Sequence, residues 1–247
     1  MVRGTPGGQQ VGREKMQEKK GKGFLLGGPA GTGANGPQEG DIRLRDERGN
    51  WHVVQGIPLY PPLYTDRSAT IAVIDSGILA DHPQIRGLIA EQEDFTGEGP
   101  EDRIGHGTIV AILTLQARSA APPEFQNLPS PRILVAKVAD ADGTVDKHAV
   151  ISAIDWAASR GAGVVNLSLG FIEGTDDYSD LCSAITKHPE VLFVAAAGNY
   201  GPDVRVYPAA CAQDGAANII SVGTTDDWSG KGDIQAPGTV TLKPLEP

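Results

Sequence analysis

Cysteine is scarce in this 247-residue sequence, which contains only Cys182 and Cys211. Two cysteines exclude a framework of several disulfides and a metal cluster built from cysteine alone. Their spacing does not decide whether they pair with each other. We favour buried free thiols, because no leader is evident at the start of the sequence and disulfides are rare in reducing compartments.

Long apolar runs are also missing. The first thirty residues offer only Phe24-Leu25-Leu26, which is far short of a signal-peptide core. No stretch of the chain approaches the roughly 20 apolar residues of a membrane-spanning helix. We therefore predict a cytoplasmic protein that has no membrane partner.

Positive charge is in short supply over most of the chain. The formal net charge is −10, and residues 1–40 carry six basic and three acidic side chains, so that residues 41–247 carry a net −13. An acidic body repels the phosphate backbone of nucleic acids. We therefore predict no nucleic-acid partner.

Three segments differ in composition. Residues 1–40 are rich in glycine, glutamine and lysine without apolar periodicity, which predicts a disordered tail. Residues 41–67 read as a short hairpin between Ile42 and Val54 followed by a proline-rich linker. Residues 68–247 carry the patterns of a folded domain, for which the sequence supplies many glycines and prolines for tight turns.

From Thr70 onward, short β-branched runs alternate with helical patterns, which is typical of a parallel sheet with crossover helices. The predicted strands are Thr70–Ile74, Arg132–Val138, Gly163–Leu169, Val191–Ala196 and Asn218–Val222, and the predicted helices are His106–Gln116, Asp146–Ser159 and Asp177–Lys187. Ligands of such sheets bind beyond the carboxyl ends of the strands. This rule marks four places: Asp75-Ser76-Gly77, the turn from Val138 to Gly143, Ser168-Leu169-Gly170, and Ala197-Gly198-Asn199.

Three residues at these ends could carry chemistry. Asp75 follows an all-apolar strand and could cap the next turn or orient a base. His106, between two glycines, could be a surface histidine or a general base partnered by Asp75. Asn199 could serve a glycine-aided turn or donate its side-chain amide to an oxyanion.

Seven short motifs follow one another along the chain: Ile71-Ala72-Val73-Ile74-Asp75-Ser76-Gly77-Ile78, Gly105-His106-Gly107-Thr108, Asn166-Leu167-Ser168-Leu169-Gly170, Val194 to Asn199, Tyr207-Pro208-Ala209, Ile220-Ser221-Val222-Gly223 and Ala236-Pro237-Gly238. Over residues 68–238 this series resembles subtilisin-like serine proteases, the subtilases. The resemblance implies a three-layer α/β fold with a central, mostly parallel sheet and flanking helices.

The same resemblance implies roles for individual residues. Asp75 would orient His106, His106 would be the base, and Asn199 would be the oxyanion donor. Ser168, Leu169 and Gly170 would bind the substrate residues before the scissile bond, so that the partner is a peptide or protein substrate. Cofactors are not expected; many subtilases bind structural Ca²⁺, but the resemblance maps no such site onto this sequence.

One departure from the family pattern concerns the nucleophile. The family places its serine in a Gly-Thr-Ser motif beyond the Ala-Pro-Gly landmark, whereas no Thr-Ser dipeptide occurs in this sequence. Ser229 precedes that landmark in a turn-like run and is not a substitute. The resemblance thus covers a subtilase domain missing its C-terminal part, and we expect no acyl-enzyme from the chain itself.

Three interpretations of that departure remain open: a protease sequence cut short, a pseudoprotease that binds peptides or a partner, and one part of a split enzyme whose serine segment lies on another chain. In the family the missing segment supplies a helix beside the one that begins at His106. Its absence should leave Ile109, Ile112 and Leu113 without a packing partner.

Two further patterns suggest binding sites only weakly. The glycine-rich stretch from Lys22 to Asn35 resembles a phosphate-binding loop, but Ala34 and Asn35 stand where lysine and Ser/Thr are needed. The stretch from Asp140 to Asp146 resembles a Ca²⁺ loop, but it lacks the bidentate glutamate of an EF-hand. We predict a solvated turn there, leading into a helix capped by Asp146.

Overall fold

The computed structural model describes residues 23–25, 43–45, 51–53, 70–116 and 131–236. The central feature is a seven-stranded sheet with the order β13-β12-β10-β8-β4-β6-β5, in which every neighbouring pair is parallel. Its strands are β4 (Thr70–Asp75), β5 (Ile89–Asp94), β6 (Arg132–Lys137), β8 (Val164–Leu167), β10 (Leu192–Ala196), β12 (Ile219–Gly223) and β13 (Ile234–Gln235). The predicted α/β architecture with a mostly parallel sheet is confirmed.

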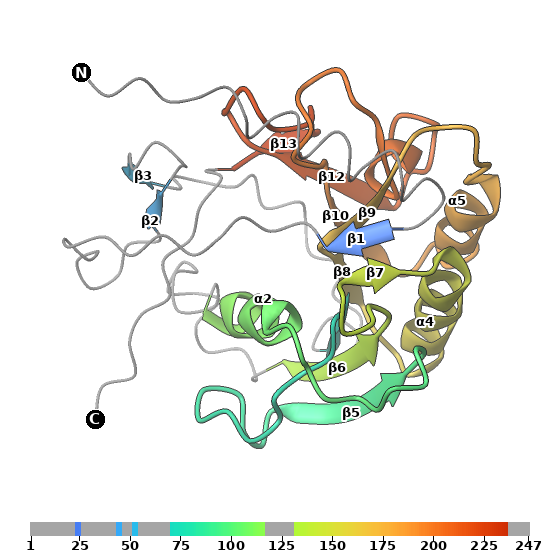
Figure 1. Ribbon diagram of the computed structural model, residues 1–247. Coiled ribbons are helices and arrows are strands. Elements are labelled where there is room, and N and C mark those ends of the chain that lie inside the picture. The colour runs from blue at the N-terminus through green and yellow to red at the C-terminus, as the bar shows by residue number, and fades with distance from the viewer. Residues whose placement is uncertain (1–22, 26–42, 46–50, 54–69, 117–130, 237–247) are drawn as a thin grey trace.

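In the part of the chain that the structure describes, three helices pack against this sheet: α2 (His106–Gln116), α4 (Lys147–Ser159) and α5 (Ser179–Thr186). They match the three predicted helices to within two residues at each end. Asp146 accepts hydrogen bonds from the amides of His148 and Ala149, so the predicted cap of α4 is confirmed. Figure 1 shows α4 and α5 side by side, away from α2.

The two faces of the sheet are covered differently. In β4, Ala72 and Ile74 contribute to a large buried cluster that includes residues of α4 and α5, whereas Val73, between them, belongs to a smaller cluster that includes residues of α2. This alternation follows from the two-residue period of a strand. The sheet therefore lies between two helical layers, the α4–α5 side having the larger core.

The exposure of α2 differs in part from prediction. Ile109 is 39% exposed, as expected for a side chain without a packing partner, but Ile112 is only 2% exposed. Ile112 lies in the smaller cluster with Val73 and Ile85, so the expectation that it lacks a partner is wrong. The sheet and the segment before β5 cover this residue, while Leu113 is half-buried.

A second sheet has the order β11-β9-β1-β7. It comprises β1 (Gly23–Leu25), β7 (Thr144–Val145), β9 (Leu169–Ile172) and β11 (Val206–Tyr207), all paired antiparallel. The prediction of disorder throughout residues 1–40 does not hold for Gly23–Leu25, because these backbone groups pair with two strands of the folded domain. The rest of that tail lies outside the described residues.

A separate hairpin precedes the domain. Strands β2 (Arg43–Arg45) and β3 (Trp51–Val53) pair antiparallel, with Arg43 opposite Val53. The two short strands predicted between Ile42 and Val54 are therefore confirmed. The proline-rich linker predicted after them lies outside the described residues.

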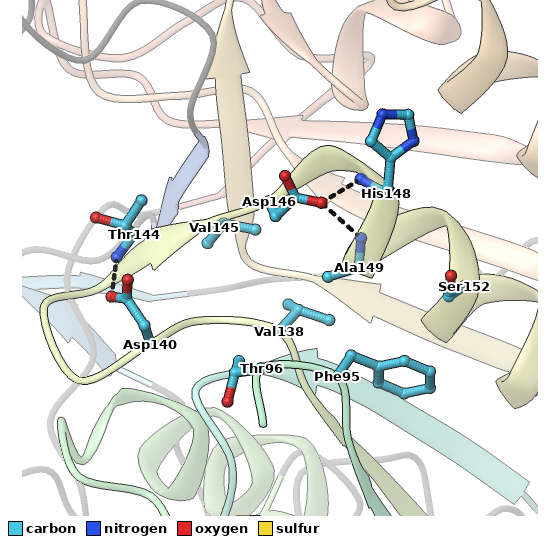
Figure 2. Close-up of a pocket in the computed structure, with 10 residues that line it drawn as sticks. All are labelled: Phe95, Thr96, Val138, Asp140, Thr144, Val145, Asp146, His148, Ala149 and Ser152. Carbon is cyan, nitrogen blue, oxygen red and sulfur yellow. Dashed lines mark hydrogen bonds between the residues drawn. The ribbon is translucent and has the colours of Figure 1, made fainter. Parts of the chain in front are cut away.

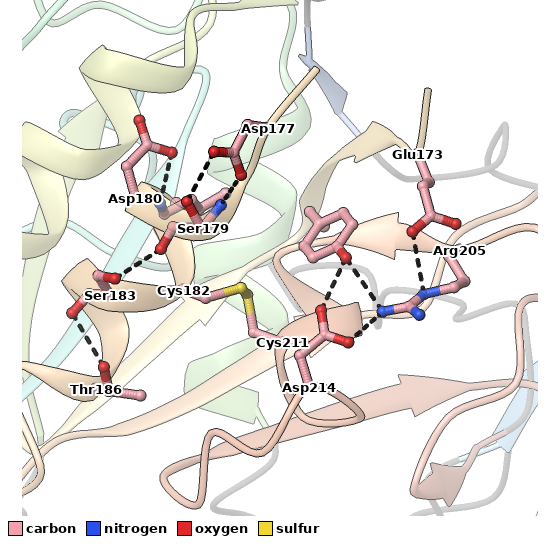
Figure 3. The surroundings of a disulfide bond; sticks show 12 residues. Glu173, Asp177, Ser179, Asp180, Cys182, Ser183, Thr186, Arg205, Cys211 and Asp214 are labelled. Atoms are coloured by element: carbon pink, nitrogen blue, oxygen red, sulfur yellow. Dashed lines mark hydrogen bonds and ion pairs between the residues drawn. A yellow bond between two sulfur atoms is a disulfide. The ribbon is translucent and has the colours of Figure 1, made fainter. Parts of the chain in front are cut away.

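Cys182 and Cys211 form a disulfide, so our preference for free thiols is wrong. The bond joins α5 to η3 (Ala209–Cys211), and the two Cα atoms are 5.4 Å apart (Figure 3). Sequence spacing could not reveal this pairing, because it depends on the packing of two elements separated by β10. Within the described ranges, no helix combines the length and apolar character needed to cross a bilayer.

Candidate active site

The candidate site lies at the carboxyl edge of the central sheet. Strands β10, β8 and β4 are consecutive in the sheet, and their carboxyl ends lead to Asn199, Ser168 and Asp75, respectively. His106 is the first residue of α2. Topology thus gathers the predicted site residues at the edge where open α/β sheets bind their ligands.

Asp75 and His106 are in direct contact. Nδ1 of His106 lies 2.7 Å from Oδ1 of Asp75, which also accepts a 2.7 Å hydrogen bond from the amide of Ser76. The side chain of Asp75 is fully buried, and that of His106 is 18% exposed. The carboxylate oxygen accepts in this contact when the ring proton is on Nδ1. The predicted proximity is confirmed, while the catalytic roles stay predictions.

Two glycines allow this close approach. A Cβ atom added at Gly107 would lie 2.3 Å from the carbonyl oxygen of Gly77 and 3.2 Å from Oδ1 of Asp75. Gly77 itself has φ +102°, and a Cβ there would lie 2.5 Å from the carbonyl oxygen of Pro100. A side chain at Gly107 would therefore push the start of α2 away from the end of β4, and one at Gly77 would collide with the backbone from Pro100 to Asp102.

A second buried carboxylate, Asp102, supports the same pair and was missed by sequence reasoning. It accepts hydrogen bonds from the Ser76 hydroxyl at 2.8 Å, from the Gly105 amide at 2.8 Å and from both the amide and the hydroxyl of Thr108 at 2.9 and 2.7 Å. The Ser76 hydroxyl in turn accepts from the Gly107 amide at 2.9 Å. Asp102 therefore ties the start of α2 to the loop after β4.

The ionisation of Asp102 reflects these contacts. Burial alone would raise the pKa of Asp102, but the hydrogen bonds from Thr108, Gly105 and Ser76 outweigh it and lower the pKa below its ordinary value. The carboxylate is therefore charged at neutral pH. No helix-start rule pointed to this residue, because Asp102 lies before the cap position and the first turn of α2.

Lys137 is a buried cation beside the site, also missed from sequence. Its side chain is fully buried, and its Nζ donates to the carbonyl oxygens of Glu101 at 3.0 Å and Ser76 at 3.3 Å. Lys137 pairs with Asp75 in the register of β4 and β6. Its Nζ also lies 3.9 Å from Oε2 of Glu98, whose side chain is 31% exposed.

Asn199 follows β10, two strands from β4. The turn before it depends on Gly198, which has φ +101° and a carbonyl oxygen that accepts from the Gly230 amide at 2.9 Å. Ser229 is only 3% exposed, and its hydroxyl accepts from the Thr224 amide and donates to the Gly230 carbonyl oxygen. The Ser229 hydroxyl is thus engaged within its own turn.

The predicted substrate-binding residues mark the transition from β8 to β9. The Ser168 hydroxyl donates to Oδ1 of Asn166 at 3.0 Å, while Leu169 and Gly170 are buried and begin β9. Strand β9 lies between β11 and β1 in the second sheet. The structure therefore presents these residues as a strand that binds another strand through its backbone.

The turn after β6, the fourth predicted place, borders a pocket of about 440 Å³ (Figure 2). Asp140 accepts from the Thr144 amide at 2.9 Å, and Asp146 caps α4. These carboxylates serve backbone amides, as expected of a turn leading into a capped helix. The described residues contain no group of three or more His, Cys, Asp or Glu arranged to hold a metal ion.

Comparison with known sequences finds relatives of this chain. A sequence profile described as the subtilase family matches residues 66–244. Thermitase of Thermoactinomyces vulgaris is 32% identical over 176 residues, covering 70% of this chain and 60% of thermitase. Subtilisin BL of Lederbergia lenta is 32% identical over 185 residues, covering 70% of this chain and 65% of that protein. The chain thus spans less than two thirds of the length of either relative.

A solved structure agrees at the level of the fold. The crystal structure of the epidermin leader peptide processing serine protease of Staphylococcus aureus aligns with a TM-score of 0.52 and 24% sequence identity, covering 66% of this chain and 49% of that one. The arrangement of the sheet and its helices is therefore shared with a known protein.

Proposed function

The chain belongs to the subtilase family, and from that premise we propose that it carries the acid–base half of a serine endopeptidase. The observation that supports this most is the 2.7 Å contact between His106 Nδ1 and the buried carboxylate of Asp75. Asp75 fixes the tautomer that leaves Nε2 as the basic nitrogen of the ring.

The proposed reaction follows from this tautomer. Nε2 of His106 takes the proton of a serine hydroxyl as its oxygen attacks a peptide carbonyl, and Asp75 stabilises the imidazolium that forms. The imidazolium then gives the proton to the leaving amine, so that an acyl-enzyme remains, which water hydrolyses by the same steps. The Asn199 amide would donate to the oxyanion, and removal of the donor with this role in subtilisin itself costs about 10²–10³ in turnover.

The 247 residues contain no Thr-Ser dipeptide, the pair in which the family carries its nucleophile. We propose that the chain by itself is inactive and that a segment on the same or another polypeptide completes it. A fluorophosphonate probe should label the purified chain only at background. A stoichiometric adduct on any of its serines would contradict this.

A completed enzyme tests the proposed roles. We would append the segment of thermitase that follows its match with this chain and measure hydrolysis of a peptide substrate. Activity should appear and should be lost in His106→Ala, whereas His188→Ala, the matched control on another His–Asp pair, should retain it. Activity that survives His106→Ala would show that another residue is the base.

A second candidate function is a non-catalytic peptide-binding module, and one observation favours it. Strand β9 already holds an extended segment, β1, through backbone pairing, which needs no nucleophile. The two candidates differ in the completed chain, because a binding module would take up peptides without cutting them.

The location of the protein is also open to proposal. The cytoplasmic assignment rested on the absence of an evident leader in the sequence, whereas the disulfide between Cys182 and Cys211 is typical of oxidising compartments. We propose that the chain matures in such a compartment. Titration of free thiols on protein taken from its native host should find none. Two free thiols would show that the disulfide does not form there, which would favour a reducing compartment such as the cytoplasm.

A further inference from the structure

Ser76 follows Asp75 in the chain, and both its amide and its hydroxyl are engaged beside the Asp75–His106 pair. The amide donates to Oδ1 of Asp75 at 2.7 Å, the same oxygen that contacts Nδ1 of His106. The hydroxyl accepts from the amide of Gly107 at 2.9 Å. Because Gly107 follows His106, Ser76 is bonded to both sides of the pair.

The carboxylate of Asp75 is held through one of its two oxygens. Its side chain is fully buried, and Oδ2 has no hydrogen-bond partner among the described residues. Oδ1 is therefore the atom through which neighbouring groups fix the carboxylate. Since the Ser76 amide donates to this oxygen independently of His106, it holds the carboxylate in place while the imidazole moves.

A second link runs beside the contact between Asp75 and His106. The hydrogen bond from the Gly107 amide to the Ser76 hydroxyl joins the first turn of α2 to the end of β4. Amides in the first turn of a helix lack a partner within the helix, so the hydroxyl satisfies one of them. This link restricts the separation of the two elements that carry the imidazole and the carboxylate.

Asp102 sets the direction of the Ser76 hydroxyl. A hydroxyl has one proton to donate, and Ser76 donates it to Oδ1 of Asp102 at 2.8 Å. The lone pairs of the hydroxyl oxygen are then left for the Gly107 amide. Because Asp102 is ionised, its hydrogen bond with the hydroxyl is stronger than one between neutral groups, and it makes the hydroxyl oxygen a better acceptor.

We propose that Ser76, oriented by Asp102, is a positioning residue that keeps Nδ1 of His106 on the carboxylate of Asp75. The inference rests on the proposed function, since the alignment of this pair affects a reaction only if His106 is the base. Ser76 acts through its two neighbours in the pair. Small displacements of such a pair matter, because a misplacement of about 1 Å can cost about 10²-fold in rate.

The protein contains a matched control for this arrangement. Ser221 in β12 is also buried, and its hydroxyl donates to Oδ2 of Asp233 at 2.8 Å and accepts from the amide of Asp233 at 2.9 Å. Strands β10 and β8 lie between β12 and β4. Ser76→Ala and Ser221→Ala therefore remove the same kinds of hydrogen bond, but only the first removes them beside His106.

The measurement is the exchange of histidine ring protons with water, followed by NMR on the full ¹⁵N-labelled chain. In wild type, the Nδ1 proton of His106 should exchange slowly, because it must leave the Asp75 carboxylate before water can take it. Ser76→Ala should speed this exchange about tenfold, the factor expected when a hydrogen bond to a charged group is lost. Asp102→Asn should also speed it, whereas Ser221→Ala should leave it within about twofold of wild type.

His188 provides a reference within each molecule. Its Nε2 lies 2.7 Å from Oδ1 of Asp155, and the exchange of a proton there should be the same in wild type and in all three variants. Slow amide exchange at Val73 in β4 would show that a variant is folded. If Ser76→Ala does not fold, Asp102→Asn carries the test.

The outcomes separate this proposal from the proposed function. Unchanged exchange at His106 in either folded variant of the Ser76–Asp102 pair would overturn the positioning role. Equal acceleration by Ser221→Ala would overturn it as well, because a general loosening of the fold would then explain the effect. If Nδ1 of His106 carries no slowly exchanging proton in wild type, the contact with Asp75 does not form, and the proposed function fails together with the role that rests on it.

Discussion

Two histidine–carboxylate pairs in this protein have the same length and different settings. His106 contacts Asp75 through Nδ1 at 2.7 Å, and His188 contacts Asp155 through Nε2 at 2.7 Å. The Asp75 side chain is fully buried at the carboxyl edge of the sheet, whereas that of Asp155 is 42% exposed on α4. Separation alone therefore does not distinguish a candidate catalytic pair from a surface ion pair.

The surroundings make the distinction. Ser76, the residue after Asp75, is held from two sides. Its hydroxyl donates to the carboxylate of Asp102, and its carbonyl oxygen accepts from the buried Nζ of Lys137. Asp155 instead shares both of its oxygens with the exposed Lys187, whose Nζ lies 3.0 Å from each. Burial by itself would raise the pKa of Asp155, but hydrogen bonds from His188 and Lys187 lower it. Because Lys187 also binds Asp155, the charge of this carboxylate is compensated by a second cation besides His188.

The largest expected difference between the pairs is catalytic. In the enzyme completed with a serine segment, Asp75→Asn should lower kcat about 10⁴-fold, because the amide favours the wrong tautomer of His106. Asp155→Asn should leave kcat within about twofold, since it acts on another histidine. The measurement is steady-state hydrolysis of a peptide substrate; comparable losses in both variants would remove the distinction.

The disulfide should contribute more to the stability of the region around His188 than the ion pair with Asp155 does. The Cys182–Cys211 disulfide closes a loop with a sequence separation of 29 residues. Replacing both cysteines by serine should cost about 3.5 kcal/mol of unfolding free energy by loop-closure entropy. Urea denaturation of the variant and wild type measures this.

A loss below about 1 kcal/mol would show that the packing of α5 and η3 holds this region without the bond. Reduction of the wild type should reproduce the effect of the double substitution, which serves as its control.

Asp102→Asn tests the hydrogen bonds that Asp102 accepts beside the His106–Asp75 pair, which have no counterpart described for the His188–Asp155 pair. Removing a buried carboxylate that accepts several charge-assisted hydrogen bonds should cost about 3 kcal/mol at neutral pH. Because the folded pKa of Asp102 is lowered, its contribution is present above the ordinary aspartate pKa of about 3.9 and is lost as pH falls through the folded value. The stability gap between wild type and variant should therefore narrow in acid.

Urea unfolding at a series of pH values between neutral and about 3 measures that gap. A difference that is constant over the whole range would mean that the charge of Asp102 does not stabilise the fold, and that the variant fails for steric reasons. Asp155→Asn in the same series is the control for loss of a surface carboxylate.

Asp155→Asn should have the smallest effect. An ion pair with 42% of one side chain exposed is screened by water and salt, so its loss should cost only about 0.5 kcal/mol. The cost should shrink further at high ionic strength, because surface pairs are screened within about 10 Å at 0.1 M salt. Thermal melts at low and high salt test this; a loss above about 2 kcal/mol would make the two pairs alike.

Much of the fold could be predicted because the hydrophobic pattern of most elements matches their burial in the folded domain. Strand β4 is an apolar run buried on both faces, and α2 and α4 begin where the sequence predicted. Strand β5, Ile-Ala-Glu-Gln-Glu-Asp, was missed because it lies at the edge of the sheet with three exposed residues, so its composition is that of a loop. Strand β13 has only two residues and no detectable period.

The candidate site was predictable only in part, for a similar reason. Asp75 and His106 stand in short motifs at strand and helix ends, where topology brings them together. Asp102 and Lys137 both contact Ser76, which lies 26 and 61 residues away in the sequence, and no local pattern encodes such partners. The pairing of β1 with β9 likewise joins residues about 145 apart, beyond the reach of periodicity.

The position of the ring proton on His106 tests the central claim most directly, and it can be measured on the chain as it stands. Long-range ¹H–¹⁵N correlation spectra, recorded where both rings are neutral, report which nitrogen of each histidine is protonated. We predict the proton on Nδ1 of His106, leaving Nε2 as the base, and on Nε2 of His188, whose partner contacts that nitrogen. A proton on Nε2 of His106 would contradict the account, because Asp75 would then not be orienting a base.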